Sequence, residues 1–455
     1  MAIVAEPRRQ PPPATPAGAV SAAAAGVAAI MVAGAALVTA TWWRAAPPPS
    51  GAGSALTDAG RLTGLLAGYV ALLQVTLRIR LPVVEHKLGT DSINDTHRLL
   101  GGYLIVLIVG HATLITAGYA LAARSSVPQQ LTTLVTSYPY IWWAVIAASL
   151  LIGIAISSLP VIRGRLLYEA WHGLHLLVYA ALALAFFHQV TVGEHFRHQA
   201  VLRTAWTVLF AGAGAAVLVF RFLRPWYLSL RHHLVVGSVV HETPDIISIR
   251  VTGRNIHRLH ARPGQYFRWR FLAPGAWYLA HPYSLSEEPD GQSFRITVRI
   301  AGRHTAKLAQ LPAGTRVIAE GPCGGLIARA SWAGPVALIA GGIGITPLRA
   351  LFATAPCAEH AITLVYRVHD AADIVFRAEL ERIAAQRGGT VHFLTGRRED
   401  PRNDLSPASL TRLCPDLTWS RVFVCGPAGY AQTIRASLAS LGVPRSRVRS
   451  ESFRM

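Results

Sequence analysis

The chain has 455 residues, enough for two or three domains. Hydrophobic residues make up 52% of it and charged residues only 15%, which excludes a wholly soluble protein and indicates membrane spans. The net charge of +20 would suit nucleic acid, an anionic membrane surface or phosphate ligands, and the apolar half of the chain favours the last two. We therefore expect a lipid bilayer, and no nucleic acid, among its partners.

The first part of the chain predicts a membrane domain over residues 19–223, after a Pro-rich tail, residues 1–18, that we expect to be disordered. Each apolar run in it is near the ~20 residues that a helix needs to cross the hydrocarbon core, so we predict a six-helix transmembrane bundle. The runs are residues 19–43, 61–82, 97–120, 138–162, 169–189 and 203–223.

Basic residues predict the orientation of this domain. Arg and Lys gather in the tail and after the second, fourth and sixth runs, whereas the other loops are less basic. By the positive-inside rule, we expect an integral cell-membrane protein with both termini in the cytoplasm.

Two predicted spans carry histidines, which are costly in lipid and are therefore functional candidates. The third span has His97 and His111, whose fourteen-residue spacing places them on one helix face and ~21 Å apart along it. The fifth span has His175 and His188, which an ideal helix would turn roughly 140° apart, so this helix needs a kink or bulge, or side chains that reach around. His172 fits neither pair.

The third and fifth spans run in the same direction, so His97 and His175 lie near the cytoplasmic side, and His111 and His188 near the outer side. Neutral imidazole is a good axial ligand for haem iron, and these pairs predict two haems stacked across the membrane. The alternative is a haem-free scaffold in which the histidines only hydrogen-bond neighbouring helices.

This pattern resembles the ferric reductase and NADPH oxidase transmembrane superfamily. The resemblance implies six spans, two b-type haems held by His97, His111, His175 and His188, and a cytoplasmic FAD/NAD(P)H dehydrogenase half. In this interpretation His172 is an additional packing residue.

The second part of the chain changes to shorter elements. Alternating segments such as SIRVTG, QYFRWRF and FRITVRI predict β-strands, and they resemble the antiparallel β-barrel FAD domain of ferredoxin reductases, here over residues 230–328. Strands then alternate with Gly-rich turns and helices, which predicts an α/β Rossmann-like NAD(P)H domain with a parallel sheet over residues 333–455.

The segment HPYSLS carries the strongest flavin signal, because it resembles the family motif R-x-Y-S. The resemblance places Tyr283 against the flavin and the Ser284 hydroxyl near its reactive nitrogen; His281 stands where many relatives have Arg. Arg299 could supply the missing charge, and Thr305 would cap the next helix. The alternative is that this segment is only the end of a strand and binds no ligand. The predicted flavin residues are His281, Pro282, Tyr283, Ser284, Arg299, His304 and Thr305.

The segment AGGIGITPL follows an apolar strand and opens a helix, so the amides of its turn could bind a pyrophosphate. The resemblance places Thr346 and Cys425 beside the nicotinamide, although Cys425 could simply be a small buried residue. The predicted nucleotide residues of these two motifs are Gly341, Gly342, Gly344, Ile345, Thr346, Cys425, Gly426 and Pro427.

Three arginines follow strands of this domain: Arg367, Arg397 and Arg398. A guanidinium binds phosphate with a bidentate fork, so they favour NADPH over NADH, unless they are only solvated surface charges. The chain ends in ESFRM, and relatives end in an acidic-x-aromatic tail that covers the flavin. We therefore predict Phe453 as a lid beside Glu451, rather than a frayed terminus, and Ser284, Cys425, Glu451 and Phe453 as the catalytic set.

The predicted function is a transmembrane oxidoreductase that passes electrons from cytoplasmic NAD(P)H through FAD and two b-type haems to an acceptor outside the cytoplasm. The preferred candidates for this acceptor are ferric iron chelates. The alternatives are dioxygen as the acceptor, or a membrane-anchored reductase of a partner redox protein. In an outer loop, His195 and His198 could bind iron or copper, although exposed histidine pairs are usually only solvated.

Overall fold

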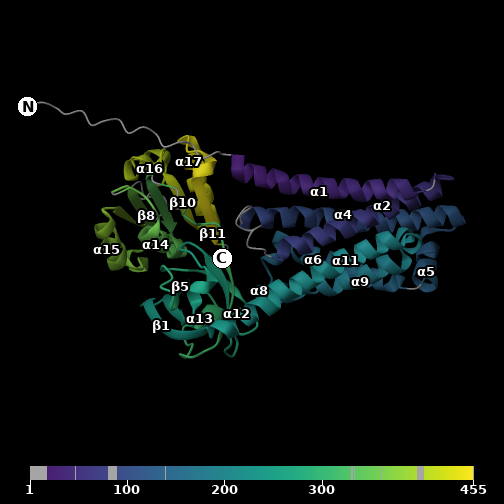
Figure 1. The fold of residues 1–455 in the computed structure, drawn as a ribbon. Coiled ribbons are helices and arrows are strands. Elements are labelled where there is room, and N and C mark those ends of the chain that lie inside the picture. The colour runs from purple at the N-terminus through teal and green to yellow at the C-terminus, as the bar shows by residue number, and fades with distance from the viewer. Residues whose placement is uncertain are drawn as a thin grey trace, which may run out of the picture. The chain divides into compact units, whose positions relative to one another are not determined.

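The computed structural model describes residues 18–46, 48–79, 90–138, 140–328, 332, 334–358, 360–396 and 404–453. Nearly all of the tail predicted over 1–18, and both Arg397 and Arg398, lie outside the described residues. Two compact units form: a helical unit, Ala24–Leu81 with Asp91–Phe222, and a second unit whose main part begins at Leu223 (Figure 1).

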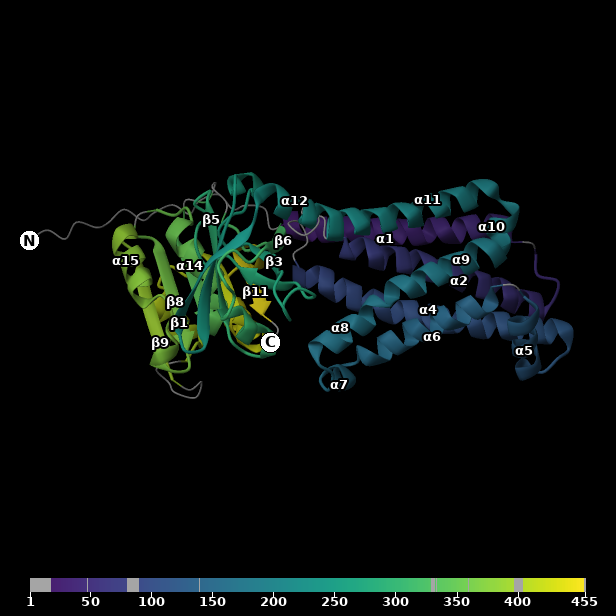
Figure 2. The same cartoon turned by 90° about the horizontal axis from the view of Figure 1, so that it is seen from below.

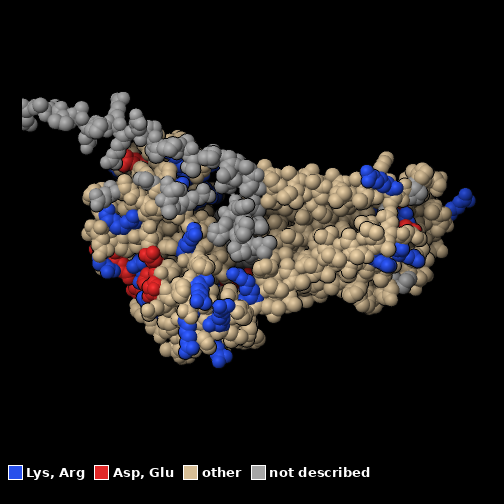
Figure 3. All heavy atoms as spheres, in the orientation of Figure 1, with Lys and Arg blue, Asp and Glu red and all other residues tan. Residues whose placement is uncertain are grey.

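Long helices run alongside one another in the helical unit (Figures 1 and 2). Its surface in Figure 3 is almost free of charged side chains except toward one end, and many large apolar side chains are exposed on it, such as Val106 and Val201. The elements are α1 Gly18–Ala45, α2 Ala52–Arg78, α4 Thr90–Ala123, α5 Val127–Ser137, α6 Ile141–Ser157, α7 Pro160–Arg163, α8 Tyr168–Leu176, α9 Val178–Val192, α10 Glu194–His198, α11 Ala200–Val217 and η1 Leu218–Leu223.

Five helices of the described residues are long and apolar enough to cross a membrane. The predicted count of six holds only if α5 and α6, which meet at 113°, form one broken span. The fourth span is not a single long helix because α6 alone has 17 residues, and α5 before it is rich in Thr and Gln. The predicted fourth span is therefore shorter than its apolar run.

The second unit begins with antiparallel strands, but their ladders do not confirm the predicted β-barrel. Two three-stranded sheets occur among the described residues, in the orders β1-β2-β5 and β4-β3-β6. Isolated bridges join Val235 to Arg316 and Leu285 to Ile296, and both sheets share a core that includes Phe267, Trp269 and Phe294. The elements are α12 Arg224–His232, β1 Val235–Thr243, β2 Ile246–Thr252, η2 Ile256–Leu259, β3 Tyr266–Phe271, β4 His281–Ser284, β5 Ser293–Arg299, α13 Arg303–Leu308 and β6 Val317–Cys323.

The rest of the second unit confirms the predicted α/β arrangement. Its parallel sheet has the order β11-β10-β7-β8-β9. The strand order reverses between β7 and β10, and ligands of such sheets bind outside the carboxyl ends of the strands at that point. The elements are β7 Val336–Gly341, η3 Gly342–Gly344, α14 Ile345–Thr354, β8 Ile362–Val368, η4 Ala371–Asp373, α15 Arg377–Arg387, β9 Thr390–Thr395, α16 Pro407–Leu413, β10 Arg421–Pro427, α17 Ala428–Ser440, η6 Arg445–Arg447 and β11 Val448–Phe453.

Candidate functional site

Glycines on α2 bring this helix close to α4. Gly60, Gly64 and Gly68 are four residues apart, and small residues at this spacing let helix backbones approach each other. A Cβ added at Gly60 would lie 2.9 Å from Cγ1 of Ile115, and one added at Gly64 would lie 2.7 Å from Nδ1 of His111. The His111 ring therefore lies directly against the backbone of α2.

The Gly60 carbonyl oxygen fixes the tautomer of His111. It lies 2.7 Å from Nδ1 of the imidazole. Because a carbonyl can only accept, Nδ1 carries the proton and Nε2 keeps the lone pair that a metal ligand needs. The histidine was predicted from the sequence, whereas Gly60 was missed; the four-residue glycine repeat is the signal that could have found it.

We expect Gly64→Ala to destabilise the helical unit. The added methyl group would overlap the His111 ring, and overpacking of this kind typically costs about 1–3 kcal/mol. Thermal unfolding of the purified protein in detergent should show a lower Tm. Gly110→Ala is the matched control, because a Cβ there meets no atom within 4 Å; equal Tm values for both variants would contradict the close contact.

The other predicted histidines lie on α4 and on the α8–α9 segment. The ring centres of His97 and His175 are 6.4 Å apart, with their planes at 63°. His111 lies on the same helix as His97, and His188 lies on the same segment as His175. The Nδ1 atoms of His97, His175 and His188 are buried and have no hydrogen-bond partner among the described residues. Each pair therefore takes one imidazole from α4 and one from the α8–α9 segment.

The fifth predicted span is interrupted between its two histidines, as their thirteen-residue spacing requires. α8 ends at Leu176 and α9 begins at Val178. The amide of Leu177 bonds to the carbonyls of Leu174 and His175, a tighter turn than that of an α-helix. This break changes the rotation between His175 and His188.

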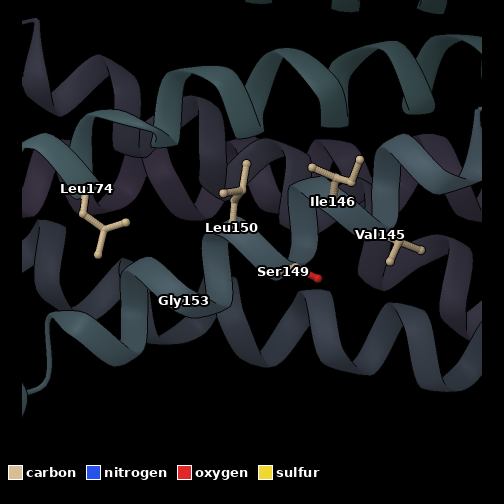
Figure 4. A pocket seen from close by; sticks show the side chains of 6 residues that line it. All are labelled: Val145, Ile146, Ser149, Leu150, Gly153 and Leu174. Atoms are coloured by element: carbon tan, nitrogen blue, oxygen red, sulfur yellow. The ribbon is translucent and has the colours of Figure 1, made fainter.

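An apolar hollow of about 360 Å³ lies in the helical unit beside α6 (Figure 4). Of its lining residues only Ser149 has a polar side chain, and none is titratable, so the hollow suits an acyl chain better than a redox group. The lining residues are Val145, Ile146, Ser149, Leu150, Gly153 and Leu174.

Charged residues form a cluster where α2 meets α10. Arg61 reaches Asp58 at 3.0 Å and Glu194 at 3.2 Å, and Nε2 of His198 lies 3.1 Å from the Glu194 carboxylate. His198 is thus engaged by a neighbour on its own helix, and the side chain of His195 lies outside the described residues. Among the described residues no group of three or more His, Cys, Asp or Glu could hold a metal ion.

In the second unit, the predicted flavin residues His281, Pro282, Tyr283 and Ser284 make up strand β4. In the strand register, Ser284 pairs with Tyr266 of β3, and Tyr266 pairs on its other side with Cys323 of β6. The Ser284 side chain is only 3% exposed, and neither its hydroxyl nor that of Tyr283 has a hydrogen-bond partner among the described residues. Burial raises the pKa of Tyr283. Buried hydroxyls without partners are rare, so both are candidates to meet a ligand.

The remaining predicted flavin residues lie near this strand or make other contacts. The His281 and His304 rings are 3.9 Å apart. Arg299 lies 3.6 Å from Asp373. Thr305 lies at the third position of α13, where its hydroxyl accepts from the amides of Ala301 and Gly302 and so caps the start of the helix. A six-residue helix of this kind gives no strong anion site.

The glycine turn after β7 packs against the end of β10. A Cβ at Gly344 would overlap the Cys425 carbonyl, and Gly342 has a left-handed φ of 55°. Thr346 is buried, and its hydroxyl donates to the Ile343 carbonyl at 3.0 Å. The two predicted nucleotide motifs therefore meet at the point where the strand order reverses.

The C-terminal segment is a strand and is not frayed in the described residues. In β11, Glu451 pairs with Cys425 of β10, and Phe453 pairs with Pro427. The Gly325 amide donates to the Glu451 carboxylate at 3.2 Å. Burial, and then the negative charge of Glu451, raise the pKa of Cys425 well above its usual value, so its thiol stays protonated. The predicted catalytic residues from β10 and β11 thus lie side by side.

A cavity of about 240 Å³ opens at the end of β8. Arg367 lines it, and its buried Nε has no hydrogen-bond partner among the described residues. The Tyr430 hydroxyl at its wall donates to the Ala340 carbonyl at 3.1 Å. The other lining residues are Asp404, Leu405, Ser406, Thr433, Ile434 and Ser437.

Two parts of the chain match known families. Residues 63–186 match the family described as ferric reductase like transmembrane component, and residues 338–436 match the oxidoreductase NAD-binding domain. The chain thus joins a region similar to ferric reductase transmembrane components to a region similar to oxidoreductase NAD-binding domains. With its long apolar helices, the ferric-reductase-like region indicates an integral membrane protein.

Curated relatives of the chain include the glycine betaine monooxygenase reductase subunit of Chromohalobacter salexigens, 27% identical over 239 residues, 49% of this chain and 64% of that protein. The ferredoxin reductase component of the 3-ketosteroid-9-alpha-monooxygenase of Mycobacterium tuberculosis is 30% identical over 208 residues, 43% of this chain and 56% of that protein. The chain spans less than two thirds of either relative. Among solved structures, the FAD/NAD binding domain of nitric oxide dioxygenase from Vibrio cholerae aligns with a TM-score of 0.40 and 21% identity, covering 48% of this chain and 97% of that one.

Proposed function

We propose that this protein passes electrons from cytoplasmic NADPH, through FAD and two b-type haems, to an acceptor on the other side of the membrane, with ferric iron chelates as the first candidate. The observation that carries the proposal is the pairing of histidines from α4 and the α8–α9 segment inside an apolar helical unit. When bound, flavin takes two electrons from nicotinamide and releases them singly, and haem carries single electrons.

The separation within one histidine pair fits a shared metal ion. Two imidazoles that bind the same metal ion, each through a bond of about 2 Å, would have ring centres at most roughly 6 Å apart. The separation of 6.4 Å between His97 and His175 is close to this value. His111 has its Nδ1 proton engaged by Gly60, which leaves Nε2 for a metal and orients the ring. His97 and His175 would hold the inner haem, and His111 and His188 the outer one.

The second unit supports the proposed flavin and nicotinamide sites. The Ser284 hydroxyl would bond the flavin, and the Tyr283 ring would lie against it. The hydroxyl groups of both residues lack hydrogen-bond partners among the described residues. Cys425, buried and protonated, would line the nicotinamide side without acting as a nucleophile. Phe453 of β11 pairs with Pro427 of β10, and its ring would cover the flavin until nicotinamide arrives.

Spectra of the purified protein test the proposal. We expect the absorption of low-spin b-type haem, two haems per chain, and reduction of both on addition of NADPH. A content near zero would favour a scaffold whose histidines only pack helices, and one haem per chain would contradict the paired arrangement. Vesicles of defined orientation, assayed for ferric chelate reduction and for superoxide and peroxide release, would decide between a ferric reductase and an NADPH oxidase. The side of the membrane on which NADPH is oxidised would test the proposed cytoplasmic termini.

We expect Arg367→Ala to raise KM for NADPH about tenfold or more while leaving KM for NADH nearly unchanged. The buried Nε at the cavity would otherwise bind the 2′-phosphate, and a hydrogen bond to a charged group contributes about 1.5–3 kcal/mol. Steady-state kinetics with both nucleotides measure this. Arg412→Ala, on the exposed side of α16, is the control; equal increases for NADPH and NADH would rule out 2′-phosphate recognition by Arg367.

A second candidate function is supported by the relatives, which are named as the reductase subunit or component of monooxygenases. In this case the membrane protein would hand electrons to a partner redox protein. It predicts no reduction of ferric chelate or dioxygen by the purified chain until that partner is added, although NADPH still reduces the flavin.

A further inference from the structure

A charged network joins the antiparallel sheets to the helices of the α/β part. Arg295 of β5 makes two hydrogen bonds to the Glu379 carboxylate in α15, at 2.8 and 2.9 Å. Arg349 of α14 reaches the same carboxylate with Nε at 2.9 Å and Nη2 at 2.8 Å. Glu287, which lies between β4 and β5, is 3.1 Å from Arg295. We call Arg295, Arg349, Glu379 and Glu287 the Glu379 network.

The two arginines of this network are shielded from water, whereas the Glu379 side chain is 27% exposed. The side chains of Arg295 and Arg349 are 9% and 10% exposed, and the Arg295 guanidinium lies 4.7 Å from the centre of the Phe376 ring. Burial alone would raise the pKa of Glu379, but hydrogen bonds and charges from Arg295 and Arg349 lower it to about 2, so the carboxylate is ionised at physiological pH. A bidentate pair of this kind fixes the orientation of both partners, unlike an exposed ion pair.

On the flavin side, Arg295 holds the chain segment that follows β4. Its Nη2 donates to the Ser286 carbonyl at 3.2 Å, and its own carbonyl accepts from the Ser286 amide at 2.8 Å. Ser286 is two residues beyond Ser284, whose buried hydroxyl is the proposed flavin contact. The place of that hydroxyl is therefore tied to Arg295.

On the nucleotide side, Arg349 lies one helical turn after Ile345, the first residue of α14. This helix follows the glycine turn directly and holds Thr346 in its first turn. Glu379 therefore connects the two halves of the proposed hydride-transfer site with a single carboxylate. The link between Arg299 and Asp373, at 3.6 Å and more exposed, is weaker.

We propose that Glu379 is a positioning residue, which sets the distance between the flavin contacts on β4 and the nicotinamide contacts at the glycine turn, and thereby the rate of hydride transfer. The inference rests on the proposed function. Glutamine at this position has one acceptor oxygen and is neutral, so it loses the two-oxygen pair with Arg295 and places an NH2 group against a guanidinium. A misplacement of about 1 Å between reacting groups can cost roughly a hundredfold in rate.

The test uses the full-length protein loaded with FAD and compares Glu379→Gln with Glu381→Gln. Glu381 lies on the same helix but is 52% exposed and has a 3.5 Å pair with Arg377. Stopped-flow reduction of the flavin under anaerobic conditions, over a range of NADPH concentrations, gives the limiting rate and the Kd. NADPH deuterated at the transferred position gives the isotope effect and its temperature dependence, which report on the distance between donor and acceptor.

For Glu379→Gln we expect a limiting rate lower by about ten- to a hundredfold, an unchanged Kd and an isotope effect that becomes more temperature-dependent. Glu381→Gln should match the wild type. A limiting rate per bound flavin that stays at the wild-type value, even with a lower Tm, overturns the inference. If Glu379→Gln does not retain FAD, Arg349→Gln is judged by the same criteria. A wild-type flavin that NADPH and NADH fail to reduce would instead refute the proposed function.

Discussion

Replacing His111 with alanine is expected to abolish reduction of the outside acceptor while NADPH still reduces the flavin at the wild-type rate. His111 is the best prepared ligand among the four histidines, because the Gly60 carbonyl holds its Nδ1 proton and its ring rests against Gly64. Its removal would leave His188 without the opposite imidazole, so the outer electron carrier would be lost while the second unit remains intact.

The measurement pairs acceptor reduction by vesicles with stopped-flow flavin reduction in the same preparation, and haem content by pyridine haemochrome. We expect one haem per chain in place of two. Thr113→Ala is the control, because this residue of the same helix is exposed and its hydroxyl, among the described residues, donates only to the Val109 carbonyl. Normal acceptor turnover in the His111 variant would refute a relay through the outer pair.

The parts of the fold that could be predicted from the sequence are those that depend on local pattern. Alternation of strand, glycine turn and helix predicted the parallel sheet, and the strand order then places the Gly342 turn beside Cys425. Helical geometry predicted that His175 and His188 need a kink, a bulge or side chains that reach around, and the structure has a break between α8 and α9. The lengths of the apolar runs predicted the spans, except for the fourth, where α5 and α6 meet at 113°.

The parts that could not be predicted depend on contacts between distant segments. The Gly60 carbonyl meets His111 across 51 positions of sequence, and Arg295 meets Glu379 across 84. In the sequence Glu379 is one acidic residue on a helix with several charges, and nothing local separates it from Glu381. Closure of a barrel is also a long-range property, which the strand pattern at β1 to β6 does not determine.

Replacing Ser284 with alanine is expected to slow flavin reduction by NADPH by about ten- to a hundredfold. The proposed role of its hydroxyl is to bond near the flavin atom that receives the hydride, and each tenfold loss corresponds to about 1.4 kcal/mol of transition-state stabilisation. Stopped-flow flavin reduction at saturating NADPH measures this, with Ser238→Ala on the exposed face of β1 as the control.

Stability makes the Ser284 experiment decisive. Because the hydroxyl is buried without a partner among the described residues, its removal breaks no internal hydrogen bond and takes away a group that is costly to bury. The Tm of the FAD-free protein should therefore be unchanged or higher in Ser284→Ala, while the reaction becomes slower. A hydroxyl that served only the fold would give the reverse, a lower Tm with a normal rate, because the loss would then fall on packing around β4 and not on the flavin.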